Sequence, residues 1–235
     1  MQRGSCFSST TRFFQRTAFA MHRSRSAFSC GSDADESGFK ILSEESMHSR
    51  YLKVSNRKVA YPKRGDRTQE EVYEYDVVSS RHPHFCVVFP FHSAKPGKPA
   101  EVTVLREYCQ GPHSLTLSLP AGGFDPQKHH SKEECAQQEL SEEAQLVGGK
   151  TVPLLPPDHP GFPEVKWCAN RFTPFLLIDP EEDSSPLTQD AEEYIEVLRV
   201  SVDEFKRMMV EGNMLPPSIV TANVAFDYLI QHGFL

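Results

Sequence analysis

The order of hydrophobic and polar residues predicts a series of strands beyond residue 50. Residues 71–79 alternate apolar and polar side chains over much of their length, as in a strand with one buried face. Residues 84–91 form a near-continuous apolar run, which is typical of a central strand. A turn rich in glycine and proline joins this run to a strand at 100–108, so we predict a hairpin. Two further strands are expected at 165–179 and 194–200.

Two helices are predicted near the C-terminus from their end signals. Ser201 and Glu204 have the spacing of a capping box, in which a serine side chain and a glutamate three residues later satisfy the first amides of a helix. We expect that helix to extend to about residue 211, before Gly212. A last helix is expected over 218–231, after a pair of prolines.

A third helix, short and acidic, is expected over 131–146. Ser131 is a suitable N-cap, and Glu134 three residues later completes another capping box. At about 100° per residue, three apolar side chains fall within a narrow arc that faces the core. These are Ala136, Leu140 and Val147.

Three carboxylates share a second arc of this helix, next to the apolar one. Glu139, Glu142 and Glu143 are spaced i, i+3 and i+4, so they repel one another and resist burial. A hard divalent cation would relieve both costs, because it prefers oxygen ligands. The alternative is a solvated acidic face, which is the usual role of a charge run. The glycine turn at Gly122 favours the metal site, since backbone without a side chain can approach a phosphate.

Residues 119–146 resemble the Nudix box, the strand–loop–helix signature of the Nudix hydrolases. Gly122 matches the opening glycine, residues 139–143 (ELSEE) match the helical core, and Leu146 matches the final apolar position. The loop is two residues longer than the pattern. Three positions depart from the box, which has glutamate, arginine and glycine where this chain has His130, Gln138 and Gln145.

Segments around the box are similar to the ADP-ribose and ADP-sugar pyrophosphatase branch of that family, in a plant or algal organellar form. They are the entry 119–122 (LPAG), the loop 159–162 (HPGF) with Glu164 close behind, and the strand 192–197 (EEYIEV) ahead of two helices. The resemblance covers about residues 50–235. It implies an α/β Nudix fold, an α/β/α sandwich around a mixed β-sheet, with a small N-terminal β annex that makes homodimers.

The resemblance also implies a reaction, the metal-dependent hydrolysis of the pyrophosphate bond of a nucleoside diphosphate linked to a moiety X. ADP-ribose or an ADP-sugar is the expected substrate, giving AMP and a sugar phosphate. Mg²⁺ or Mn²⁺ would be held by the three glutamates and by a backbone carbonyl of the turn. The implied metal ligands are Ala121, Glu139, Glu142 and Glu143.

The catalytic base is expected in the loops after the box. Glu164, Glu192 and Glu193 are the candidates, beside Glu142 and Glu143 as catalytic residues, although a solvated loop is an equal alternative. The expected substrate-binding residues are Arg106, Gly122 and Phe162. Arg106 can instead close the hairpin in a surface charge pair, His130 can bind a metal or remain exposed, and Trp167 can stack on a base or belong to the core.

Composition separates the N-terminus from the rest. Residues 1–32 hold five arginines, seven serines and no acidic residue, which is typical of a transit peptide, and the serines favour a chloroplast over a mitochondrion. Without those arginines, the remaining 20 basic and 32 acidic residues give a net charge of −12, which disfavours nucleic acid as a partner. No apolar run approaches the roughly 20 residues that span a bilayer, so no membrane contact is expected.

These features predict an organellar protein with a transit or disordered segment at 1–35, a linker and β annex at 36–80, and a Nudix domain at 81–235. Within the annex, 33–49 is expected to be a polar linker. A different class remains open, a Nudix fold with weakened catalysis that binds a nucleotide or a protein. The substitutions Gln138 and Gln145 motivate it, and metal binding by the glutamates would decide against it.

Overall fold

The structure, a computed structural model, describes residues 38–189, 193–211 and 213–235, without the side chain of Arg67. The expected transit segment at 1–35 lies outside these residues. In chain order the elements are β1 (Lys40–Ser49), β2 (Leu52–Lys63), β3 (Asp66–Ser80), β4 (His84–His92), β5 (Glu101–Cys109), β6 (Ser114–Ser118), β7 (Ala121–Gly123), α2 (Lys132–Ala144), β8 (Leu146–Val147), β9 (Lys150–Pro153), β10 (Phe162–Pro163), β11 (Arg171–Ile178), β12 (Glu181–Glu182), β13 (Ile195–Ser201), α3 (Val202–Val210) and α4 (Pro216–Gln231).

The main sheet is mixed. Its strands run in the order β10-β11-β4-β5-β13, while β6 pairs with β5, β7 with β4 and β9 with β11. Only the β4–β11 pair is parallel among these, and the expected β4–β5 hairpin is confirmed by the antiparallel pair Phe91 and Val102. Pro174 lies inside β11 without interrupting it, because β10 pairs up to Phe172 and β9 pairs only from Phe175 onward. The missing amide of the proline therefore falls between two partner strands.

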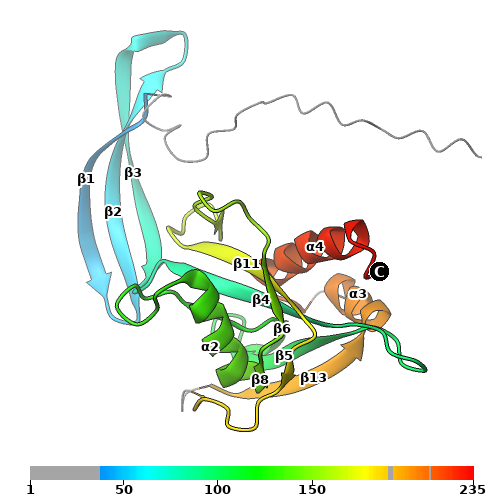
Figure 1. The fold of residues 1–235 in the computed structure, drawn as a ribbon. Coiled ribbons are helices and arrows are strands. Elements are labelled where there is room, and N and C mark those ends of the chain that lie inside the picture. The colour runs from blue at the N-terminus through cyan, green and yellow to red at the C-terminus, as the bar shows by residue number, and fades with distance from the viewer. Residues whose placement is uncertain (1–37, 190–192, 212) are drawn as a thin grey trace, which may run out of the picture.

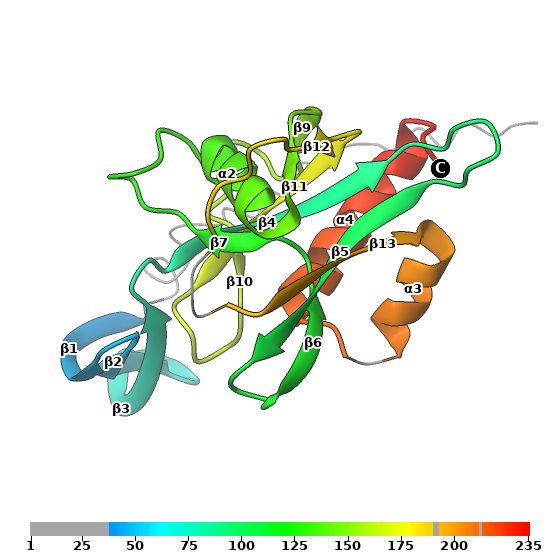
Figure 2. The same cartoon turned by 90° about the horizontal axis from the view of Figure 1, so that it is seen from below.

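Helices cover both faces of this sheet (Figures 1 and 2). Successive side chains of β4 point to opposite faces, so Cys86 and Val88 pack with α2, while Val87 and Phe89 pack with α3 and α4. Both sets are completely buried, which explains why the strand is apolar at every position. This three-layer arrangement confirms the α/β/α sandwich around a mixed sheet.

The N-terminal strands form a separate three-stranded antiparallel sheet, β1-β2-β3, which projects from the body (Figure 1). Its base is held by Val78 of β3, whose amide donates to the carbonyl of Trp167 at 3.0 Å and whose carbonyl accepts from Ala169 at 2.8 Å. The predicted linker at 33–49 is wrong from Lys40 onward, since β1 pairs with β2 along most of its length. All ten residues of β1 are exposed, so no alternation of polarity marked it as a strand. None of the described helices is long and apolar enough to cross a membrane.

Candidate active site

A cavity of about 510 Å³ opens where β7 meets α2. The turn between β1 and β2 forms one wall through Tyr51, and the segment before β13 forms another. Carboxylates dominate the inner surface, together with the backbone of the glycine turn. The backbone and the carboxylates in this lining belong to Ala121, Gly122, Glu139, Glu142, Glu143 and Glu193, among others.

The start of α2 is fixed by its own side chains. Ser131 Oγ accepts from the amide of Glu134 at 3.0 Å, which confirms the predicted N-cap. The Glu134 carboxylate reaches back to the amide of His130, at 2.5 Å, so the reciprocal bond lies one residue earlier than in a standard capping box. This pairing sets the rotation of the helix and therefore the direction of its glutamates.

The end of α2 differs from the prediction. The helix stops at Ala144 because Gln145 adopts a left-handed conformation, with φ 56° and ψ 37°. Val147 consequently lies in β8 with 42% of its surface exposed, and its predicted place in the core stripe is wrong. The residues that α2 buries are Cys135, Ala136, Leu140, Ser141 and Ala144.

The first contact across the cavity is between Gly122 and Glu139. The Glu139 carboxylate occupies the space that a Cβ atom on Gly122 would fill. The backbone of Gly122 does not have a positive φ, so glycine is required here for space and not for conformation. Gly122 thus lets a strand backbone and a helix carboxylate meet at one wall of the cavity.

Glu143 is held against the strand that ends the glycine turn. Its Oε2 accepts a hydrogen bond from the amide of Ala121 at 2.8 Å. Burial raises the pKa of the Glu143 carboxyl well above its ordinary value of 4.5, and the negative charge of Glu139 raises it further, against the opposing effect of the Ala121 amide. The charges of Glu193 and Glu107 act in the same direction. Burial and neighbouring negative charge thus act together to disfavour the ionised form of Glu143.

The residues present fit a divalent cation by the chemistry of their donors. Carboxylate oxygens line one cavity, and a cation there would compensate the burial and the repulsion that raise the pKa of Glu143. Within the described part of the chain, no three acidic, histidine or cysteine side chains already converge in ligating geometry. A bound ion would therefore draw the glutamates closer than they lie here.

The acidic segment after β11 is tied to α2. Ser141 Oγ donates to Asp183 at 2.7 Å and accepts from the amide of Leu187 at 3.0 Å, and the Asp183 amide donates to the carbonyl of Gln145. These hydrogen bonds hold residues 183–187 beside α2. Further along, Glu193 lines the cavity, whereas the alternative base Glu192 lies outside the described residues.

Comparison with known proteins identifies the family. A sequence model described as “NUDIX domain” matches residues 80–216. The chain belongs to the Nudix family. Among solved structures, one described as “Crystal structure of ADP compounds hydrolase” is similar, with a TM-score of 0.62 and 17% identity over 84% of this chain and 97% of that chain. At that identity the likeness concerns the fold. A search of curated proteins finds no match.

The three residues that depart from the Nudix box lie in different places around α2. Gln138 lines the cavity in place of the arginine of the box, and Gln145 stands at the left-handed helix end in place of the glycine. His130 is exposed, while the neighbouring His129 is 7% exposed, stacks on Phe124 and lines the cavity. The structure therefore does not favour a metal role for His130.

Glu164 is held in a different environment from the glutamates of α2. Its Oε2 accepts from Asn170 Nδ2 at 2.9 Å and from Cys168 Sγ at 3.5 Å. Asn170 in turn accepts from the amide of Ser80 at 2.9 Å. Glu164 is absent from the described residues that line the cavity. These contacts indicate that it fastens the loop after the box to β3, and the structure favours Glu193 over it as a base.

Two predicted substrate contacts are also absent from the described lining of the cavity, Arg106 and Phe162. Arg106 Nη1 lies 3.2 Å from Glu196 Oε2, so Arg106 forms a surface charge pair, but the pair links β5 to β13 and does not close the predicted β4–β5 hairpin. Phe162 packs on Phe172, with 5.6 Å between the ring centroids. Trp167 is 64% exposed, so it does not belong to the core, which is one of the two roles that the sequence allows.

The sequence interpretation missed residues that reach the site from other elements. Glu107 follows Arg106 on β5, and alternation turns it toward the opposite face, where its charge acts on Glu143. His82 and Lys128 also line the cavity. Of these residues, only Glu107 could have been placed from the sequence. Alternation along the predicted strand puts its side chain on the face opposite to Arg106.

Proposed function

We propose that the chain hydrolyses the pyrophosphate bond of a nucleoside diphosphate linked to X, with ADP-ribose or an ADP-sugar as substrate. The products would be AMP and a sugar phosphate. The observation that carries this proposal is the cavity in which Glu139, Glu142, Glu143 and Glu193 meet the backbone of Gly122. The fold likeness to a structure described as an ADP compounds hydrolase supports the choice of substrate.

In this reaction Glu139, Glu142 and Glu143 would hold Mg²⁺ or Mn²⁺, with the carbonyl of Ala121 as a further ligand. The cation, when bound, supplies Lewis-acid stabilisation of the charge on the pyrophosphate. An ion and a proton would compete for the Glu143 carboxylate, and the raised pKa of Glu143 strengthens that competition.

The remaining residues bind substrate and move a proton. Glu193 reaches the cavity from the segment before β13 and would accept the proton of the attacking water. Gly122, which has no side chain, lets the Glu139 carboxylate lie against the backbone of β7. Lys128 and His82 lie on the loop side of the cavity, where they would orient the anionic substrate.

The test is release of AMP by the full chain, offered ADP-ribose and ADP-glucose with Mg²⁺ or Mn²⁺. Glu142→Gln and Glu143→Gln should each abolish metal-dependent release. Glu133→Gln is a matched control, because Glu133 is an exposed glutamate in the first turn of the same helix. Release without added metal, or undiminished release by both cavity variants, would refute the proposal.

A second function, nucleotide binding without efficient turnover, is favoured by two observations. Gln138 brings no positive charge to the glutamates, and the described side chains do not yet converge as ligands. The same experiment separates the two functions. Saturable binding of ADP-ribose by calorimetry, together with no AMP release under any metal condition, would establish the binding module.

We also propose that the chain forms a homodimer through the annex. Large apolar side chains of the annex sheet are solvent-exposed in the single chain, and such a surface favours association. They are Ile41 (60% exposed), Leu42 (53%), Met47 (63%), Val72 (54%) and Tyr73 (45%). Light scattering after size exclusion should give twice the chain mass, and Ile41→Glu should shift it toward the monomer.

A further inference from the structure

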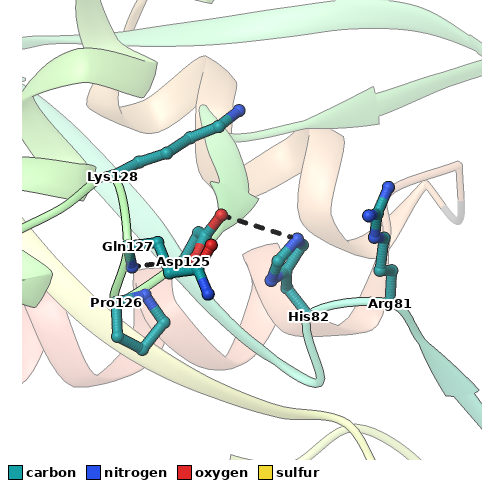
Figure 3. A pocket seen from close by; sticks show the side chains of 6 residues that line it. All are labelled: Arg81, His82, Asp125, Pro126, Gln127 and Lys128. Atoms are coloured by element: carbon teal, nitrogen blue, oxygen red, sulfur yellow. Dashed lines mark hydrogen bonds and ion pairs between the residues drawn. The ribbon is translucent and has the colours of Figure 1, made fainter.

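Beside the carboxylate cavity lies a second hollow of about 680 Å³ (Figure 3). Its lining comes from the end of the annex, through Arg81 and His82, and from the long loop before α2, residues 125–128. Lys128, His82 and Asp125 line both spaces, so the hollow and the cavity adjoin. A ligand bound over the glutamates can therefore extend into the hollow.

The lining of the hollow holds two cationic side chains and one carboxylate, whereas carboxylates outnumber cationic side chains in the lining of the cavity. Figure 3 shows Lys128 and Arg81 on opposite sides of the pair formed by Asp125 and His82. No ion pair is formed by Arg81 or Lys128 with any described residue. A neighbouring hollow of about 560 Å³ shares Arg81 and adds Arg50. In a chain of net charge −7, a group of unpaired cations next to the site is suited to an anionic ligand.

Asp125 is the one acidic residue in this lining, and its contacts are with the protein itself. Its Oδ1 accepts from the amide of Gln127 at 2.9 Å, and its Oδ2 lies 3.8 Å from His82 Nε2. Its carbonyl accepts from the amides of Lys128 and His129 at 3.0 and 2.8 Å. Asp125 thus shapes the loop that presents Lys128, so the cation is held on an ordered turn.

On the other side of the hollow, hydrogen bonds also hold the backbone around Arg81. Arg81 directly follows β3, and the preceding residue, Ser80, donates its amide to Asn170 Oδ1 at 2.9 Å. Ser80 Oγ donates to the carbonyl of His82 at 2.6 Å. These bonds fix the chain on both sides of Arg81. The two cations are therefore carried by backbone that is positioned before any ligand binds.

We propose that this hollow binds a phosphate group, so that the substrate is a nucleoside diphosphate linked to X that carries a further phosphomonoester on one of its riboses. The inference rests on the proposed function and refines its substrate class. The pyrophosphate would lie at the glutamates, while Arg81 and Lys128 would receive the additional phosphate. Guanidinium and ammonium groups suit such a ligand, because each donates charge-assisted hydrogen bonds to its oxygens.

The test compares kcat/KM for ADP-ribose with that for 2′-phospho-ADP-ribose and for ADP-ribose 1″-phosphate, using the full chain with Mg²⁺ or Mn²⁺. At least one phosphorylated compound should be preferred by about ten-fold, the effect of one or two exposed charge-assisted hydrogen bonds. Arg81→Gln and Lys128→Gln should each reduce this ratio several-fold. The ratio should also fall as salt rises, since salt screens exposed charges.

Lys95→Gln is the matched control, because Lys95 follows the end of β4 in the turn to β5, whereas Arg81 and His82 precede the start of β4. It should leave the ratio unchanged. A wild-type ratio near one, or a preference that survives both Arg81→Gln and Lys128→Gln, overturns the inference. If no compound is hydrolysed, the proposed function fails separately, and calorimetry with the same three compounds decides the inference. Tighter binding of a phosphorylated compound, lost in the two variants, supports it, and equal binding overturns it.

Discussion

Gly122→Ala isolates the contact between the glycine turn and the helix glutamates. The added methyl group would overlap the Glu139 carboxylate, so that carboxylate has to move away from β7. The side chain ends in an open cavity and can rotate, so the fold should tolerate the change. We expect the free energy of unfolding to change by less than about 1 kcal/mol. The effect should fall on the site instead.

The size of that effect follows from the displacement. Ordinary contact distances require the carboxylate to shift by more than about 1 Å, and a misplacement of about 1 Å at a reacting centre can cost roughly 10²-fold in rate. That factor corresponds to about 2.7 kcal/mol of transition-state stabilisation. The assay measures kcat/KM for AMP release, Mn²⁺ affinity by calorimetry, and unfolding by denaturant on the same preparations.

Gly123→Ala provides the control from the adjacent residue. A Cβ there would meet only the Cβ of His82, at 3.5 Å, which is ordinary van der Waals contact. It should change kcat/KM by no more than about three-fold, within the range of mild substitutions. Equal rates and equal metal affinities in the two alanine variants would refute the reasoning. So would a loss of activity in Gly122→Ala that simply follows unfolding.

Three further changes test other parts of the account. Gln145→Gly should stabilise the protein by about 0.5–1 kcal/mol in denaturant unfolding, because glycine adopts the left-handed conformation without strain, and a loss of stability would contradict this. With EDTA present, the folded state holds the Glu143 proton more tightly than the unfolded state, so Tm should fall as pH rises from 4.5 through the raised pKa of Glu143. Glu143→Gln should flatten that slope, and parallel Tm curves would rule the explanation out. Ser141→Ala removes the hydrogen bonds to Asp183 and Leu187, so it should lower the free energy of unfolding by about 1 kcal/mol and lower kcat by misplacing Glu193. A normal kcat in this variant would show that the loop does not contribute to catalysis.

Local signals in the sequence predicted the helices well, because their starts depend on neighbouring residues. Ser131 and Ser201 each accept from the amide three residues on, as expected from their spacing. The end of α2 had no such signal. A glutamine at the left-handed position is uncommon, so the glycines at 148 and 149 indicated a later end than the structure has.

The candidate site was predictable to the extent that it lies on one helix. Glu139, Glu142 and Glu143 share a face through helical spacing alone. The other contributors come from distant elements, and their meeting depends on strand register and loop path. Lys128 belongs to a loop whose shape is set by Asp125, and the charge of Glu107 acts on Glu143 because β5 packs against α2 through Leu105. Neither relation can be obtained from spacing along the chain.

Catalysis in the proposed reaction requires the glutamate cavity to bind a divalent cation. The most direct measurement is a titration of Mn²⁺ into the protein, followed by electron paramagnetic resonance of the free ion, for the wild type, Glu139→Gln and Glu143→Gln. Saturable binding by the wild type that is strongly weakened in both variants, while Glu133→Gln binds normally, is the predicted result. No saturable binding by the wild type, or undiminished binding by both cavity variants, would contradict the claim.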